Sequence, residues 1–169
     1  MKIYKICMEL RKGCPVTNSL KHSMWHLRQW PVVSAWKILI FLTPKLYVDR
    51  YILCDISGTQ SSSRAQFYVK VQSAMQLLSK SSPKLNRRVA RYIRYIANAS
   101  VEHDAMYYSS GRMLLLGNGF VNRSTPGALL QEIVGASTMG YLRDIGVNIP
   151  RHSSRIENLK KRLNEKWGC

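Results

Sequence analysis

Acidic residues are scarce in this sequence, and the scarcity sets its charge. The 169 residues include 26 Lys and Arg but only nine Asp and Glu, which gives a formal net charge of +17. So basic a chain is expected to associate with an anionic partner, either nucleic acid, acidic lipid or an acidic protein, unless the charge is only a solvated surface. With 46% hydrophobic residues the composition is otherwise globular, so we expect one domain with a hydrophobic core.

The four cysteines lack the spacing of a metal module or a disulfide framework. Cys7, Cys14, Cys54 and Cys169 form no CxxC pair and have no histidine at zinc-finger spacing. Neither a zinc finger nor a disulfide scaffold is therefore predicted, and this pattern favours an intracellular protein. The sequence also lacks the GxSxG and SxxK arrangements of serine nucleophiles, and it indicates no small-molecule substrate.

No apolar run reaches the length of a comfortable membrane span. The most apolar run, Val32 to Leu42, lies between Pro31 and Pro44 and covers about half of the ~20 residues that a membrane helix needs. Extending it over residues 31–53 adds several charges, which favours an interfacial or core helix over a span. Residues 1–48 contain a single acid, Glu9, a composition typical of membrane-surface or organelle-targeting segments.

A stretch without apolar residues suggests how the chain is divided. Residues 57–63 read Ser-Gly-Thr-Gln-Ser-Ser-Ser, with nothing to bury, and are predicted to form a linker. Residues 1–56 then form a basic, Trp-containing N-terminal region, and residues 64–169 form the main domain.

Apolar spacing predicts helices over residues 64–79, from Ser82-Pro83 onward and over residues 128–144. Ser82 and Thr125 each precede a proline, so both hydroxyls are expected to cap a helix. Two short strands are predicted on either side of Ser109-Ser110-Gly111, followed by a turn at Gly117-Asn118-Gly119, with no βαβ unit evident. A last helix is predicted from Ser154. The apolar residues expected to face inward on the second helix are Leu85, Val89, Ile93 and Ile96.

One side of the second helix concentrates positive charge. This basic strip is interleaved with Tyr92 and Tyr95, and it is the best candidate in the sequence for binding anions or nucleic acid. The alternative is a solvated face whose arginine stems cover apolar surface. The strip consists of Lys84, Arg87, Arg88, Arg91 and Arg94.

The helix at residues 128–144 contains a degenerate metal-binding motif. Residues 131–135 read Gln-Glu-Ile-Val-Gly, the shape of an HExxH motif without its two histidines. In HExxH two histidines four residues apart share one face of a helix and bind zinc, while the Glu is the general base.

With the elements around this motif, the chain from about Ala74 onward resembles a bacterial family of HExxH zincin-like metallopeptidases. The resemblance includes the Ser-Pro helix start with Arg87-Arg88-Val89, the apolar strand at Met113 to Leu116, Gly146 and the Arg-Ile-Glu of residues 155–157. In that family the motif helix follows a strand, and an Arg-x-x-Glu-like segment after it is suited to give a third, carboxylate ligand.

Carried over by position, Gln131 and Gly135 occupy the two histidine sites, Glu132 the base and Glu157 the third ligand. A glutamine amide replaces imidazole poorly and glycine offers no ligand, so we expect no metal, no cofactor and no hydrolysis. Rescue would require His103 and His152 to fold back onto the helix. Each position also has a structural explanation: Gly135 allows close packing, Glu132 faces solvent or pairs with an arginine, and Glu157 caps the last helix.

The sequence therefore predicts an α+β, mainly α fold: a zincin-like helical domain with a short β-hairpin, preceded by a basic amphipathic N-terminal region. The predicted function is that of a catalytically inactive structural or interaction protein that uses its basic surface, within a larger assembly. A nucleic-acid-binding protein, a peripheral membrane protein and an active zinc peptidase with unusual ligands stay open as alternatives.

Overall fold

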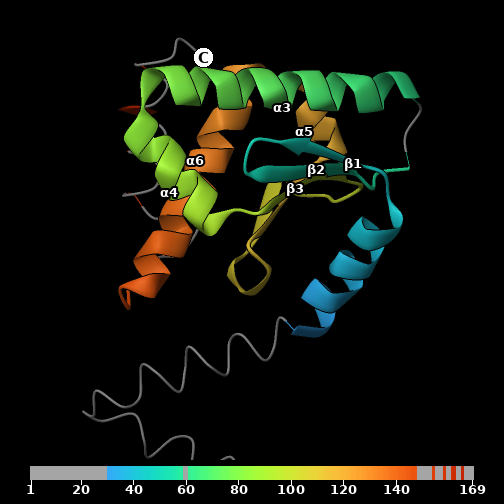
Figure 1. Ribbon diagram of the computed structural model, residues 1–169, viewed down its shortest axis with the longest axis horizontal. Coiled ribbons are helices and arrows are strands. Elements are labelled where there is room, and N and C mark those ends of the chain that lie inside the picture. The colour runs from blue at the N-terminus through green and yellow to red at the C-terminus, as the bar shows by residue number, and fades with distance from the viewer. Residues whose placement is uncertain are drawn as a thin grey trace, which may run out of the picture.

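The protein is an α+β structure built on one five-stranded mixed sheet (Figure 1). The computed structural model describes residues 30–58 and 61–147, together with residues 154, 158, 161, 162 and 165. The sheet has the order β1-β2-β3-β5-β4. The α+β class predicted from the sequence is confirmed.

Three parallel strands form the centre of the sheet, and an antiparallel strand lies at each edge. β2, β3 and β5 run parallel, β1 pairs antiparallel with β2, and β4 pairs antiparallel with β5. β2 and β5 are buried along their whole length, as expected for strands covered on both faces. The strands are β1 (Lys45–Val48), β2 (Tyr51–Asp55), β3 (Tyr95–Ala99), β4 (Ala105–Tyr108) and β5 (Met113–Gly117).

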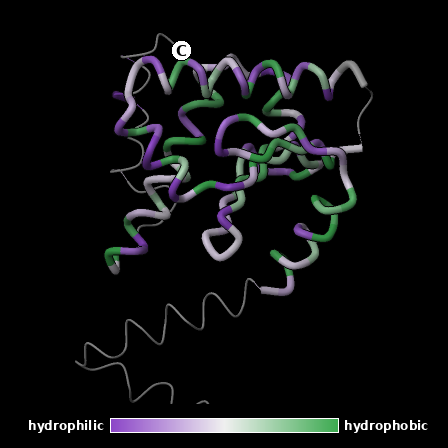
Figure 2. Tube along the Cα trace, in the orientation of Figure 1, coloured by the Kyte–Doolittle hydropathy of each residue, from purple (hydrophilic) through white to green (hydrophobic). Residues whose placement is uncertain are grey.

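Helices cover both faces of the sheet, in unequal numbers. On one face α3 (Ser61–Ser81), α4 (Pro83–Tyr92), α5 (Asn118–Arg123) and α6 (Pro126–Asp144) enclose the larger core, which includes Leu53, Ile96 and Leu114 from the strands. On the other face the helix at residues 30–42 places Val33 and Ile40 against a smaller core. Neighbouring strand residues point to opposite faces. The tube coloured by hydropathy shows apolar stretches in the strands, whereas α3 alternates between apolar and polar residues (Figure 2).

The one cysteine in the described part of the chain, Cys54, is buried, and its burial accounts for its low reactivity. Cys54 lies in the smaller core and is fully buried. Desolvation raises the pKa of its thiol to about 12, so the thiol stays protonated and unreactive at neutral pH. Cys54 is therefore a core residue.

Several local predictions are confirmed. The helix predicted over residues 64–79 is α3, the one predicted over residues 128–144 is α6, and the predicted hairpin is formed by β4 and β5. At α6 the Thr125 hydroxyl accepts a hydrogen bond from the Ala128 amide at 3.2 Å. Ser82 occupies the same position before Pro83, but its side chain makes no capping bond. Its φ of −156° and ψ of 84° lie outside the usual geometry of a capping residue.

Three of the five strands, β1, β2 and β3, were not predicted from the sequence. Ile96, predicted to lie on the second helix, belongs to β3, because α4 ends at Tyr92 and Ile93 is already extended. Isoleucines three residues apart fit a helix and a short buried strand equally well. The connection from β2 through α3 and α4 to the parallel β3 is a βαβ unit, which the sequence analysis did not recognise. Gly117-Asn118-Gly119 ends β5 and begins α5 instead of forming a turn.

The domain boundary predicted at residues 57–63 does not divide the fold. β1 and β2 precede it, yet they belong to the same sheet as β3 and β5. Ser57 has no apolar surface to bury, but its amide and hydroxyl both donate to Asp55, and residues 61–63 are already helical. Residues 45–56 are thus part of the main domain. Residues 1–29 of the predicted N-terminal region lie outside the described residues.

The apolar run Val32 to Leu42 lies within the helix at residues 30–42. One side of it packs on the sheet, in agreement with a core helix. Among the helices that the structure describes, none is long and apolar enough to cross a membrane.

Candidate functional site

The degenerate motif lies in the middle of α6, which is a core helix. Leu130, Ile133, Val134 and Ser137 are all fully buried, whereas Tyr141 is exposed. The Ser137 hydroxyl donates to the Val134 carbonyl at 2.8 Å, so its burial leaves no unsatisfied donor. The motif helix α6 packs against both α3 and α4.

The residues of the motif do not fit a zinc ion. Gly135 is buried and has no side chain that could bind a metal ion. Gln131 and Glu132 are half-buried at neighbouring positions of α6. His103 is exposed between β3 and β4, and Glu157 and His152 lie outside the described residues. Among the residues that the structure describes, no group of three or more His, Cys, Asp or Glu could hold a metal ion.

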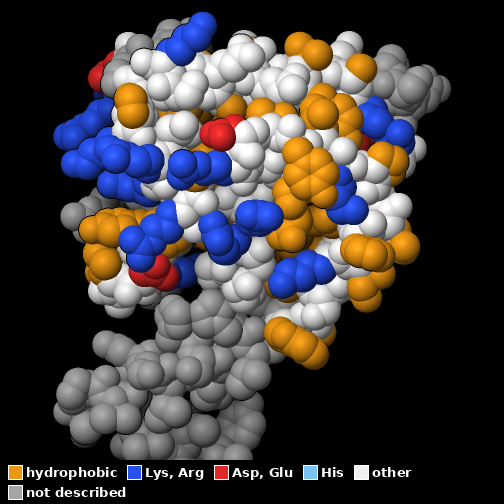
Figure 3. All heavy atoms as spheres, in the orientation of Figure 1, with side chains coloured by type: hydrophobic (Ala, Val, Ile, Leu, Met, Phe, Trp, Pro, Cys, Tyr) orange, Lys and Arg blue, Asp and Glu red, His pale blue; other side chains and the backbone are white. Residues whose placement is uncertain are grey.

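The basic strip lies on the solvent side of α4, as the sequence predicts. Lys84, Arg87, Arg91 and Arg94 are exposed and Arg88 is half-buried, while Val89 and Tyr92 face the core. Arg94 and Tyr95 lie beyond the end of the helix, in the connection to β3 and in β3 itself. Figure 3 shows Lys and Arg side chains gathered over this part of the molecule.

Two arginines of the strip are held by aromatic rings. The guanidinium of Arg88 lies 5.1 Å from the ring centroid of Tyr141 on α6, and that of Arg91 lies 5.5 Å from the ring centroid of Tyr92. Arg91 also forms an exposed ion pair with Asp144 at 4.0 Å. Each cation–π contact at an exposed site is worth about 0.5–1 kcal/mol. These contacts favour one direction for each of the two guanidinium groups before any partner binds.

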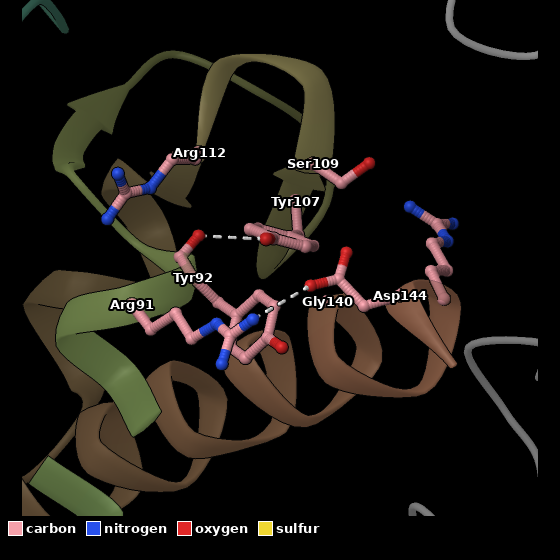
Figure 4. A pocket seen from close by; sticks show the side chains of 8 residues that line it. Arg91, Tyr92, Tyr107, Ser109, Arg112, Gly140 and Asp144 are labelled. Atoms are coloured by element: carbon pink, nitrogen blue, oxygen red, sulfur yellow. Dashed lines mark hydrogen bonds and ion pairs between the residues drawn. The ribbon is translucent and has the colours of Figure 1, made fainter. Parts of the chain in front are cut away.

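A pocket of about 210 Å³ lies where α4, the β4–β5 connection and the end of α6 meet (Figure 4). It brings two further arginines, Arg112 and Arg143, next to Arg91. We call these seven residues, Lys84, Arg87, Arg88, Arg91, Arg94, Arg112 and Arg143, the arginine face. The pocket is lined by Arg91, Tyr92, Tyr107, Ser109, Arg112, Gly140, Arg143 and Asp144.

Arg112 is held firmly in an unusual backbone conformation. Its φ is +50°, in the left-handed region where a side chain costs energy. Its guanidinium donates to the Ala90 carbonyl at 2.7 Å, and its own carbonyl accepts from the amides of Arg94 and Tyr95. Arg112 therefore connects the hairpin to the last turn of α4 and to the start of β3.

Tyr107 and Gly140 form the floor of the pocket. The Tyr107 hydroxyl donates to the Tyr92 carbonyl at 2.8 Å, as the dashed line in Figure 4 marks. Burial raises the pKa of Tyr107 above its usual value, so the phenol stays neutral. Burial also lowers the pKa of the Arg143 guanidinium, although arginine stays charged at neutral pH. The pocket thus presents fixed cations and one carboxylate, Asp144, and suits an anion better than a neutral molecule.

Replacing Gly140 with alanine is expected to lower the free energy of unfolding by about 1–3 kcal/mol, because an added methyl group overpacks this floor. A Cβ there would lie 2.6 Å from the Tyr107 hydroxyl and 2.9 Å from Cδ1 of Tyr92. Urea denaturation measures the change. Gly119→Ala is the matched control, since its Cβ meets only Arg123, at 3.6 Å. Equal free energies of unfolding for the two variants would show that Tyr107 and Tyr92 can move to accommodate the added methyl group.

Arg112 and Arg143 were missed by the sequence analysis. Arg112 follows a hairpin turn and Arg143 ends a helix, and a basic residue at a helix C-terminus already has a sufficient electrostatic role. Only the packing of the hairpin against α4 and α6 brings them beside Arg91.

Comparisons of the chain with protein-family models, with curated proteins and with solved structures find no match.

Proposed function

We propose that this chain is a non-catalytic, zincin-like binding protein whose arginine face binds the phosphate backbone of a nucleic acid, within a larger assembly. The observation that carries the proposal is a pocket lined by three arginines, Arg91, Arg112 and Arg143, beside the other cations of α4 and the exposed Arg94. The zincin-like ancestry rests on the sequence resemblance. In this chain α6 comes after β5 with the short helix α5 between them, whereas the motif helix of that family follows a strand.

Two features favour phosphate over the carboxylates of an acidic protein. Six of the seven cations are arginines, whose planar, fork-shaped guanidinium group matches phosphate oxygens in a bidentate geometry. The cations of α4 also recur along a helix of 10 residues, which is ~15 Å long and so extends along several consecutive phosphates. Asp144 is the one acid lining the pocket.

The absence of catalysis follows from the motif. Without imidazole at Gln131 and Gly135 there is no ordinary zinc site, so Glu132 has no metal-activated water to deprotonate. Zinc at one equivalent per purified chain, lost in a Glu132→Gln variant, would contradict this part of the proposal and revive the alternative of an active peptidase.

The proposal is tested by the salt dependence of binding. Fluorescence anisotropy of a labelled single-stranded RNA, titrated with the full chain at several salt concentrations, should give a linear plot of log K against log salt. If five cations contact phosphates, the slope is about −3 to −4. Affinity that is independent of salt, or no binding to RNA or duplex DNA at low salt, would overturn the proposal.

A further inference from the structure

The helix at residues 30–42 exposes an apolar face on the side away from the sheet. Only Val33 and Ile40 of this helix are buried, while Phe41 is 77%, Leu42 73% and Trp30 68% exposed. Hydrophobic side chains are visible at the corresponding corner of the molecule in Figure 3. We call this surface the apolar helix face. It consists of Trp30, Val32, Ile38, Leu39, Phe41 and Leu42.

The border of this face is aromatic and cationic. The Lys45 ammonium donates to the Phe41 carbonyl at 2.9 Å and lies 5.3 Å from the Phe41 ring centroid. Lys37 is exposed on the same helix, and Tyr47 is exposed on the edge strand β1. Lysines with aliphatic stems along apolar surface, beside Trp and Tyr, are typical of proteins at a membrane–water interface.

We infer that the apolar helix face docks on the surface of an anionic lipid bilayer. The 13 helical residues at 30–42 span ~20 Å, too short to cross the ~30 Å hydrocarbon core, so the helix lies in the plane of the interface. Lys37 and Lys45 and the net charge of +17 complement acidic headgroups. The same charges disfavour a second copy of this chain as the occupant, because two such faces would bring like charges together.

This membrane contact lies on the other side of the sheet from α4 and α6, although Lys37 at its border lies beside Gly111, the neighbour of Arg112. The helix at residues 30–42 packs on the opposite face of the sheet from α4 and α6, so the two surfaces belong to different layers. Apart from those at Lys37, substitutions in one layer are therefore expected to leave binding by the other unchanged.

Co-sedimentation of the full chain with vesicles tests the inference. The chain should bind vesicles made of phosphatidylcholine and phosphatidylserine in equal parts, and more weakly vesicles of phosphatidylcholine alone. Ile38→Ser and Leu42→Ser should each weaken binding on the order of tenfold, since each removes a large aliphatic group from the contact. Val69→Ser is the matched control, because Val69 is 61% exposed on α3, in the other layer.

Three results would overturn the inference. The first is vesicle binding that is unchanged in the Ile38→Ser/Leu42→Ser double variant. The second is binding that is lost in Arg87→Glu but not in the double variant, which would assign the lipid contact to the arginine face. The third is a dimer in solution that depends on Ile38 and Leu42, with no vesicle binding. Circular dichroism should show an unchanged Tm in all variants, because the replaced side chains are exposed.

Discussion

Reversing the charge of Arg87 and Arg94 together is expected to weaken RNA binding by about a hundredfold at low salt. Both side chains are exposed, so the glutamates would face the partner, replace two phosphate contacts by repulsion and reduce counterion release. Arg87 lies on α4 and Arg94 lies after its end. Because they are expected to contact different phosphates, the double replacement should weaken binding more than either single replacement. Fluorescence anisotropy on the full chain measures the dissociation constants.

Lys37→Glu is the control for this experiment. Lys37 is also exposed, and its replacement changes the net charge as much as each arginine replacement does. It lies on the opposite face of the sheet from α4, and its side chain approaches Gly111, the neighbour of Arg112. We expect a change of less than about threefold, since Lys37 approaches the arginine face only beside Arg112 and acts on Arg87 and Arg94 at longer range. If Lys37→Glu weakened RNA binding as strongly as Arg87→Glu, binding would follow net charge and the arginine face would have no special role.

Replacing Asp55 with alanine is expected to lower the free energy of unfolding by about 2–4 kcal/mol, a large part of the stability of a domain of this size. Asp55 ends β2 and is buried. One carboxylate oxygen accepts hydrogen bonds from the amide and hydroxyl of Ser57 and from the Asn98 side chain, and the other lies 3.7 Å from Nε of Arg64. Removing the carboxylate deletes the acceptor shared by the Ser57 amide, the Ser57 hydroxyl and the buried Asn98 side chain, together with the carboxylate partner of Arg64.

Asp104→Ala is the matched control for Asp55→Ala, with urea denaturation as the measurement. Asp104 also pairs with an arginine, Arg123, but both side chains are more than half exposed. Surface ion pairs contribute at most about 1 kcal/mol. If Asp55→Ala and Asp104→Ala lowered the free energy of unfolding equally, burial would not determine the strength of the Asp55 contacts.

Several local features of this chain could be predicted from its sequence, although the hairpin of β1 and β2 was missed, and the parallel pairing of strands could not be predicted. Thr125-Pro126 and the apolar spacing of α6 define that helix on their own, and the cationic side of α4 follows from helical periodicity. β3 was missed because parallel pairing with β2 and β5 is decided by residues far away in the chain. Its Ile96 also continues the spacing of the preceding helix.

Only part of the candidate site could be predicted from the sequence. The five cations of the basic strip were found, since they are close together in sequence, but Arg112 and Arg143 join them only through tertiary packing. The boundary at residues 57–63 was wrong for a related reason. A polar stretch was interpreted as a linker, although Ser57 is bonded to the buried Asp55, a partner whose burial the sequence does not show.

The central claim is that the chain binds nucleic acid through the arginine face, and hydrogen–deuterium exchange with and without bound RNA tests it most directly. We predict slower amide exchange in α4, in the connection up to Arg94 and around Arg112, with no change in the helix at residues 30–42. Protection confined to the helix at residues 30–42, or no protection at RNA concentrations that saturate binding, would contradict the claim.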